Sequence, residues 1–265
     1  MQFARIGDIA MCFATRQQAG EGAPWIVFAN SLGTDHRIWD AVADRLEDRF
    51  NILVYDKRGH GLSDATPAPY TMDDHIGDLA GLVDHLEIDR FAICGVSVGG
   101  MIAQGIADRL ADRVTAAIFC DTAHKIGDDA FWQERIGKIE AGGVEAIADG
   151  ILERWFTPAF CDPDRADYRG YRNMLTRTSL NGYVGTCGAL ATTDFTDLAA
   201  GLSLPVLCIA GAEDRSTPPD LVRSLAGLVP GARFEMIEGA GHIPSIEQPE
   251  ALAGLIADFI KDRSR

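Results

Sequence analysis

The sequence is poor in positive charge. Its 265 residues include 24 Lys and Arg against 39 Asp and Glu, which gives a formal net charge of −15. Proteins that bind nucleic acids need a basic surface to neutralise phosphates, and anionic membranes attract basic segments. We therefore expect neither nucleic acid nor a membrane among the partners of this chain.

Long apolar segments, a basic-then-apolar N-terminus and C-x-x-C spacings are also absent. No apolar run approaches the roughly 18 residues that a transmembrane helix requires, so we expect a cytoplasmic protein. Four of the six cysteines lie in apolar, strand-like runs, where a thiol acts as a small core side chain. We therefore expect no metal site and no cofactor. The cysteines are Cys12, Cys94, Cys120, Cys161, Cys187 and Cys208.

Apolar runs typical of buried strands alternate with helical patterns over residues 1–121 and again over 201–265. Residues 122–200 contain no strand-like run and are expected to be helical. This order predicts an α/β fold with an eight-stranded, mostly parallel sheet, helices on both faces and a helical lid inserted after the sixth strand. The predicted strands are 3–6, 9–14, 24–29, 50–56, 90–95, 114–120, 204–210 and 233–237, and the core helices are 38–46, 72–86, 100–110, 219–228 and 249–261.

One turn between a strand and a helix is the main functional motif. The strand 90–95 leads into Gly95-x-Ser97-x-Gly99, and a helical pattern opens at Gly100. In this context the motif predicts a nucleophile elbow, a turn so tight that glycines must flank it. The turn raises the Ser97 hydroxyl to the top of the sheet, where it can attack a substrate.

Two later strand ends supply partners for this serine. Asp214 follows the strand 204–210, and His242 follows the strand 233–237. A serine hydroxyl becomes an effective nucleophile when a histidine takes its proton, and a buried carboxylate then fixes the histidine tautomer. We assign Ser97 as nucleophile, His242 as base and Asp214 as orienting acid, which is the chain order of α/β-hydrolase triads. Asp121, at the end of the strand 114–120, is the alternative acid.

Such a site also needs N–H donors for the oxyanion of a tetrahedral intermediate, each worth about 3 kcal/mol. Val98 follows the serine and supplies one backbone N–H at a helix N-terminus, where the helix dipole helps. The second donor should come from the loop after the strand 24–29. We assign it to the N–H of Leu32, with Gly33 either permitting close approach or serving only as a turn residue.

Over nearly its full length the chain resembles the α/β-hydrolase superfamily. The resemblance rests on Asn30-Ser31-Leu32-Gly33-Thr34 with Trp39, Tyr55-Asp56-x-Arg58-Gly59-His60-Gly61-x-Ser63 and Gly95-Val96-Ser97-Val98-Gly99-Gly100. More narrowly, the lid and the histidine loop resemble the 3-oxoadipate enol-lactonase family. That part rests on Asp121-Thr122-Ala123, Trp132-x-x-Arg135, Arg154-Trp155-Phe156-Thr157, Gly182-Tyr183-x-x-x-Cys187 and Ala240-Gly241-His242-Ile243-Pro244.

The resemblance implies hydrolysis of a small enol-lactone that bears an acetate group. Ser97 would attack the lactone carbonyl with His242 as base, and water would release 3-oxoadipate from the acyl-enzyme. The same triad serves carboxylesterases, carbon–carbon bond hydrolases of ring-cleavage products and cofactor-free haloperoxidase-like hydrolases. A small-ligand receptor on this fold is the non-enzymatic alternative. The sequence leaves open whether the protein is a monomer or a homodimer.

An anionic substrate needs local positive charge in a protein this acidic. We expect Arg135 to bind the substrate carboxylate, because it lies three positions from Trp132 on one helix face. Trp132 and Trp155 are expected either in the lid core or along the pocket. The lid cations are Lys125, Arg135, Lys138, Arg154, Arg165, Arg169, Arg172 and Arg177.

The remaining histidines have less convincing contexts. His60 lies in a Gly-rich loop and is expected to brace it, whereas His75 and His85 are predicted on a surface helix.

Overall fold

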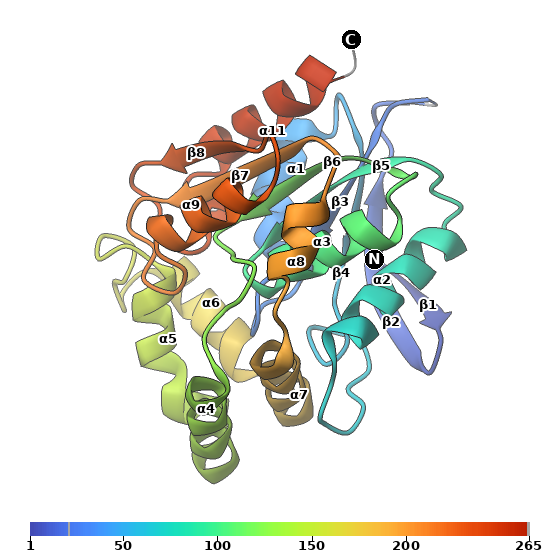
Figure 1. Cartoon of the computed structure of the whole chain (residues 1–265). Coiled ribbons are helices and arrows are strands. Elements are labelled where there is room, and N and C mark those ends of the chain that lie inside the picture. The colour runs from blue at the N-terminus through green and yellow to red at the C-terminus, as the bar shows by residue number, and fades with distance from the viewer. Residues whose placement is uncertain (21, 264–265) are drawn as a thin grey trace.

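A computed structural model describes residues 1–20 and 22–263 of the chain. Eight strands form one sheet (Figure 1). They are β1 (Gln2–Ile6), β2 (Ile9–Arg16), β3 (Trp25–Ala29), β4 (Asn51–Tyr55), β5 (Phe91–Val96), β6 (Val114–Cys120), β7 (Val206–Gly211) and β8 (Arg233–Ile237). All of them correspond to strands predicted from the sequence.

The helices of the sheet layers are α1 (Asp40–Leu46), α2 (Met72–His85), α3 (Val98–Arg109), α8 (Thr196–Gly201), α9 (Pro219–Leu228), α10 (Pro244–Glu247) and α11 (Pro249–Arg263). Between β6 and β7 lie α4 (Asp129–Gly142), α5 (Ala148–Trp155), α6 (Ala166–Thr176) and α7 (Leu180–Thr192). Two short 3-10 helices, η1 (His36–Trp39) and η2 (Val144–Ile147), complete the set. Within the described ranges, no helix is both long and apolar enough to cross a membrane.

The strand order is β1-β2-β4-β3-β5-β6-β7-β8. β2 runs antiparallel to β1 and β4, and every other neighbouring pair is parallel. The predicted eight-stranded, mostly parallel sheet is therefore confirmed. From β3 the chain continues to β4 on one side, whereas from β5 it continues to β6 on the other side. The loops that leave β3 and β5 therefore meet at a topological switch point. Open α/β sheets bind their ligands in the crevice at such a point.

Helices cover both faces of the sheet. α1 packs against α11 on one face, while α2, α3, α8 and α9 follow one another across the other. α4 to α7 lie together beyond the edge of the sheet layers in Figure 1, with α4 against α7 and α5 against α6. This helical segment stands over the end of the sheet to which β3 and β5 deliver their loops.

Local sequence signals explain where several elements begin. Thr71 caps α2, since its Oγ1 accepts the Asp74 N–H at 3.1 Å while the Asp74 carboxylate accepts the Thr71 N–H at 2.7 Å. This capping box satisfies two backbone donors at the helix start. The helix predicted from residue 38 instead starts as the 3-10 turn η1, because Asp35 accepts the Arg37 N–H at 3.1 Å and caps it there.

The predicted surface position of His75 is wrong. His75 lies on the face of α2 that packs against α7, and it is 1% exposed, whereas His85 is exposed. Its Nε2 atom lies 3.2 Å from Thr186 Oγ1. Burial, followed by the charges of Lys57 and Arg58, lowers the pKa of His75 to about 3. The 3.6-residue period identified the helix, but it could not show that α7 covers this face.

Two glycines let α7 approach the loop that follows β4. A Cβ on Gly182 would lie 1.9 Å from the Gly59 carbonyl oxygen, and a Cβ on Gly59 would lie 2.2 Å from Gly182 Cα. Such distances leave no room for a methyl group on either side. At this contact the backbone of α7 packs directly on the backbone of the loop after β4, with no side chain between them.

A pair of helical glycines tests this contact. We expect Gly182→Ala to lower the free energy of unfolding by about 1–3 kcal/mol, because the new methyl group must push two backbones apart. Gly137→Ala in α4 is the matched control, since nothing lies within 4 Å of its Cβ position. It should raise stability by about 0.5–1 kcal/mol through helix propensity. Urea unfolding of both variants decides the matter, and equal changes would contradict the close contact.

Candidate active site

Ser97 occupies a strained turn between β5 and α3. Its backbone has φ 60° and ψ −123°, a region that residues with a Cβ seldom adopt. The flanking glycines are required by space, because a Cβ on Gly95 would lie 2.1 Å from the Gly99 carbonyl oxygen. A Cβ on Gly99 would lie 2.2 Å from the Ala29 carbonyl oxygen at the end of β3. This is the geometry that the G-x-S-x-G motif predicts.

The neighbouring strand β6 holds this turn in place. The Ser97 N–H donates to the Cys120 carbonyl at 3.0 Å. Thr122 Oγ1 donates to the Ser97 carbonyl at 2.6 Å, and its side chain fills the space in front of Gly100. With its backbone groups bonded, the strained residue stays in position while its hydroxyl faces the pocket.

The loops after β7 and β8 bring Asp214 and His242 together. His242 Nδ1 lies 2.8 Å from Asp214 Oδ2, and both side chains are buried. The carboxylate also accepts the Ser216 N–H, the Thr217 N–H and the Thr217 hydroxyl, at 2.7, 3.2 and 2.7 Å. These bonds fix the carboxylate against the imidazole, so that Nδ1 carries the proton and Nε2 is free to accept one.

Asp121, the alternative acid, has a different partner. Its Oδ1 accepts the Gly211 N–H at 2.7 Å, at the end of β7. Burial, followed by the charge of Asp214, raises the pKa of Asp121 well above its ordinary value. The charged form of Asp121 is therefore disfavoured, and the carboxylate that contacts the histidine is that of Asp214. Among the described residues, no hydrogen bond joins Asp121 to His242.

Leu32 and Val98, the predicted oxyanion donors, both lie close to Ser97. Leu32 lines one pocket with Ser97 and His242, and Val98 is the first residue of α3. No hydrogen bond of the described residues uses either backbone N–H. Gly33 has φ +74°, and a Cβ there would lie 2.6 Å from Leu175 and 3.0 Å from Tyr183. Residue 33 must therefore be glycine, both for the positive φ of the turn and for the close approach of Leu175 and Tyr183.

The pocket around Ser97 and His242 is narrow, with about 50 Å³ of free space. Trp132 and Trp155 both line it and are also buried in the core, so the two roles left open by the sequence coincide. Trp132 Nε1 donates to the Ile126 carbonyl at 2.6 Å, which fixes the ring. A wider cleft of about 580 Å³ between α4 and α5 shares Phe131, Arg135 and Arg154 with this pocket.

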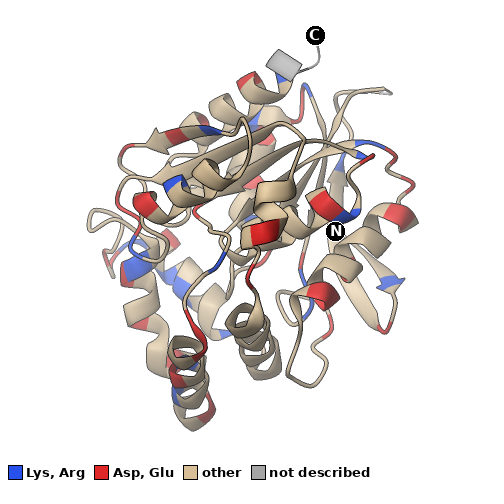
Figure 2. Ribbon diagram, in the orientation of Figure 1, with Lys and Arg blue, Asp and Glu red and all other residues tan. Residues whose placement is uncertain are grey.

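Most of the other lid cations are paired with carboxylates. Lys125, Lys138, Arg165 and Arg172 each form an ion pair. Basic and acidic positions follow one another along α4 in Figure 2. Arg135 and Arg154 have no carboxylate partner in the part of the chain that the structure describes, and both line the pocket. Sequence reasoning named Arg135 and did not single out Arg154.

Aromatic rings hold Arg135 in place. Its guanidinium carbon lies 4.8 Å from the ring centre of Phe131 and 5.0 Å from that of Trp132. A hydrogen bond also links it to the Tyr183 side chain, whose pKa burial raises and Arg135 partly lowers. A cation on aromatic faces keeps its charge for a ligand, because no carboxylate neutralises it. Arg135 can therefore receive an anion in the pocket.

Glu247 ties the histidine loop to the end of α5. Its Oε2 accepts the Gly241 N–H at 2.8 Å, and its Oε1 accepts the Thr157 N–H at 3.0 Å and the Thr157 hydroxyl at 2.7 Å. The His242 N–H donates to the Trp155 carbonyl at 2.8 Å. The backbone of the candidate base is thus held by the helical segment. No motif in the sequence pointed to Glu247, which bonds mainly to backbone groups.

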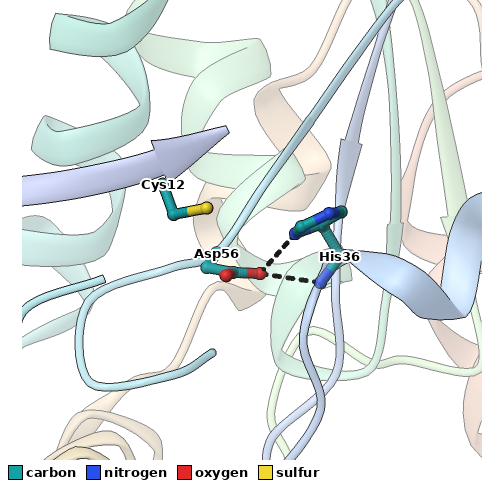
Figure 3. A group of neighbouring side chains, drawn as sticks. All are labelled: Cys12, His36 and Asp56. Atoms are coloured by element: carbon teal, nitrogen blue, oxygen red, sulfur yellow. Dashed lines mark hydrogen bonds and ion pairs between the residues drawn. The ribbon is translucent and has the colours of Figure 1, made fainter. Parts of the chain in front are cut away.

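Cys12, His36 and Asp56 form a cluster outside the pocket (Figure 3). Asp56 Oδ1 lies 2.8 Å from both the backbone nitrogen and Nδ1 of His36, and Oδ2 accepts the Leu62 N–H at 2.9 Å. Burial opposes ionisation of Asp56, but the bonds from His36 outweigh it and lower its pKa. Burial raises the pKa of Cys12 to about 11, which keeps it a thiol. We assign this cluster to bracing the loop 56–63.

The fold and the residues at its strand ends define the class of the protein. An open sheet with a strained serine after β5 and an Asp–His pair after β7 and β8 is the architecture of α/β hydrolases. A model of the alpha/beta hydrolase family matches residues 26–255. The chain belongs to the α/β-hydrolase family, as its motifs predicted.

Comparison with individual proteins gives a more specific resemblance than the family model. The chain is 35% identical to 3-oxoadipate enol-lactonase 2 of Acinetobacter baylyi, over 96% of this chain and 94% of that protein. The solved enol-lactonase of Burkholderia xenovorans has a TM-score of 0.94 and 35% identity, covering 98% of this chain and all of that one. A thermophilic esterase from Thermogutta terrifontis has a TM-score of 0.91 and 27% identity, with 99% of each chain covered.

Two isosteric substitutions test which acid serves His242. Asp214→Asn should lower kcat for p-nitrophenyl acetate by about 10³- to 10⁴-fold, because an amide cannot stabilise the imidazolium and favours the wrong tautomer. Asp121→Asn keeps an oxygen acceptor for the Gly211 N–H and should change kcat by less than about threefold, because no hydrogen bond of the described residues joins Asp121 to His242. Steady-state rates and a circular-dichroism check of folding suffice. A large loss in Asp121→Asn alone would transfer the role of acid to Asp121.

Proposed function

We propose that this protein hydrolyses 3-oxoadipate enol-lactone to 3-oxoadipate. The observation that carries the proposal is one pocket lined by Ser97, by His242 with its Asp214 partner, and by two arginines without carboxylate partners. Its similarity to two enol-lactonases over nearly the full chain supports the same substrate. The ligand is a small anionic lactone, and the steps below need no cofactor.

Acylation begins when Nε2 of His242 takes the proton of Ser97 Oγ. The oxygen attacks the lactone carbonyl, and its negative charge moves to the carbonyl oxygen, where the N–H groups of Leu32 and Val98 stabilise it. Collapse of this intermediate breaks the ring C–O bond and expels an enolate. The imidazolium of His242 gives up the proton that it took from Ser97, and the enolate gains it at carbon and becomes a ketone. The leaving group is therefore stable, ring opening is not readily reversed, and His242 is again a base.

Deacylation repeats these steps with water. His242 takes a proton from water, and the resulting hydroxide attacks the acyl carbon on Ser97. The second tetrahedral intermediate uses the same two N–H donors, and its collapse returns the proton to Ser97 Oγ and releases the free acid. Asp214 holds the imidazole in its tautomer throughout.

The arginines supply selectivity for a substrate with a carboxylate. A free carboxylate entering a protein with net charge −15 is repelled over most of the surface. Arg135 and Arg154 lie where the outer cleft narrows into the pocket, and they provide opposite charge within reach of the reacting serine. We assign Arg135 to the acetate carboxylate inside the pocket, with Arg154 beside it at the entrance.

The substrate proposal is tested by adding the enol-lactone to purified protein and following the loss of its ultraviolet absorbance. We expect turnover by the wild type and a loss of at least about 10⁴-fold in Ser97→Ala, because the remaining N–H donors act without a nucleophile. Unchanged turnover in Ser97→Ala would contradict the proposed role of Ser97 as nucleophile. Hydrolysis of p-nitrophenyl acetate without hydrolysis of the lactone would show that the enol-lactone is not the substrate.

A carboxylesterase for small neutral esters is the second candidate, favoured by the 27% identity to the thermophilic esterase. The arginines distinguish the two functions. Arg135→Ala should lower kcat/KM for the acetate-bearing lactone by about 10- to 100-fold, mainly through KM, because a charge-assisted hydrogen bond is lost. Arg154→Ala should act in the same direction by a smaller factor. For p-nitrophenyl acetate both variants should stay within about twofold of wild type.

Arg169→Ala is the matched control for these substitutions. Arg169 is an exposed arginine of α6 that lines neither the pocket nor the outer cleft, and its removal makes the same change in net charge. Its kinetics with both substrates should match those of the wild type. Equal effects of Arg135→Ala on the charged and the neutral substrate would place Arg135 outside the substrate site and favour the esterase.

A further inference from the structure

A buried lysine lies behind the loop that carries Leu32. Lys57 follows β4 directly and is 1% exposed, a rare environment for a lysine. Its Nζ atom lies 2.5 Å from the Ser31 carbonyl oxygen. Among the described residues, no carboxylate forms an ion pair with it, so this carbonyl is its main partner.

The Ser31 carbonyl is held from two sides. Besides Lys57 Nζ, it accepts the Thr34 hydroxyl at 2.9 Å and the Thr34 N–H at 3.3 Å. A carbonyl oxygen with three donors around it cannot rotate without losing at least one bond. The plane of the Ser31–Leu32 peptide is therefore set by buried groups.

That peptide plane also carries the proposed oxyanion donor. A trans peptide is planar, and its C=O and N–H point in opposite directions. Since the Ser31 carbonyl points at Lys57, the Leu32 N–H points away from Lys57, and Ser31 and Leu32 both line the pocket with Ser97. Burial lowers the pKa of Lys57 well below its ordinary value, but its Nζ can donate to this carbonyl in either protonation state. A hydrogen bond at the carbonyl end polarises the peptide and strengthens the N–H as a donor.

The next peptide is held by the same loop. The Gly33 N–H donates to His60 Nε2 at 3.0 Å, and His60 Nδ1 lies 3.1 Å from the Arg58 carbonyl. His60 can accept the Gly33 N–H only in its neutral form, with the proton on Nδ1. Burial, followed by the charge of Lys57, lowers the pKa of His60 well below its ordinary value. Residues 57 and 60 thus hold the peptides on both sides of Leu32.

We propose that Lys57 is a positioning residue for catalysis, which orients and polarises the Ser31–Leu32 peptide so that the Leu32 N–H stabilises the oxyanion. The inference rests on the proposed serine mechanism but not on the enol-lactone as substrate. Lys57 touches no substrate itself. Its effect should therefore appear where negative charge develops on the carbonyl oxygen.

Lys57→Met tests this inference, because methionine keeps most of the side-chain length and removes the hydrogen-bond donor. The readouts are kcat/KM for p-nitrophenyl acetate and the inhibition constant of phenylboronic acid. Boron accepts Ser97 Oγ and becomes a tetrahedral anion that resembles the intermediate. Loss of one oxyanion donor costs about 10²- to 10³-fold. We expect about 10- to 100-fold losses, equal within a factor of three, in both readouts.

His75→Leu is the matched control. His75 is buried close to Lys57 and bonds to Thr186 on α7, but no hydrogen bond of the described residues links it to the loop 30–34. It should lower the melting temperature without changing either readout. Thr34→Val serves as a second variant if Lys57→Met does not fold, because it removes one donor to the Ser31 carbonyl. It should weaken both readouts by about three- to tenfold.

The outcomes separate the two proposals. Parallel losses of turnover and boronate affinity in Lys57→Met or Thr34→Val, with wild-type values in His75→Leu, support the positioning role. A folded Lys57→Met with unchanged boronate affinity overturns it, as does an equal loss in His75→Leu. A wild type that hydrolyses p-nitrophenyl acetate but not the enol-lactone removes the substrate proposal and leaves this test intact.

Discussion

The tight turn at Ser97 is the constraint on which the site depends. A residue with a Cβ holds a positive φ there, and the carbonyls of Ala29 and Gly99 exclude any side chain at positions 99 and 95, respectively. The same packing brings the loop after β3 beside the serine. Nucleophile and candidate oxyanion donors are thus positioned by one contact between strand ends, and the Asp–His pair arrives from the next two strands of the sheet.

Patterns that act within one segment of the chain were readable in the sequence. The apolar runs predicted all eight strands, and the helix predicted over 72–86 corresponds to α2. The predicted family and the open, mostly parallel sheet are confirmed. The structure brings Asp214 to His242 and places His242 in one pocket with Ser97. Their catalytic roles remain a prediction, because geometry shows which groups meet and not what they do.

Features made by contacts between distant segments could not be read in this way. His75 has the spacing of an ordinary helical residue, and only the approach of α7 makes it buried. Lys57 looks like a surface lysine in a loop, yet its Nζ bonds the Ser31 carbonyl 26 positions away. Glu247 gains its partners in the same manner, from the histidine loop and the end of α5, and Arg154 shares its pocket with residues of α4. Charge and period describe a residue's own element, whereas burial depends on what packs over it.

Acylation of Ser97 is the central claim, and it can be observed directly. Wild-type protein mixed with the enol-lactone is quenched in acid during turnover, digested and analysed by mass spectrometry. We predict that the peptide containing Ser97 gains the mass of the whole lactone and that the added mass is on the serine, because ring opening adds the substrate without releasing a fragment. Turnover with this peptide unmodified, or with the added mass on another residue, would contradict the account.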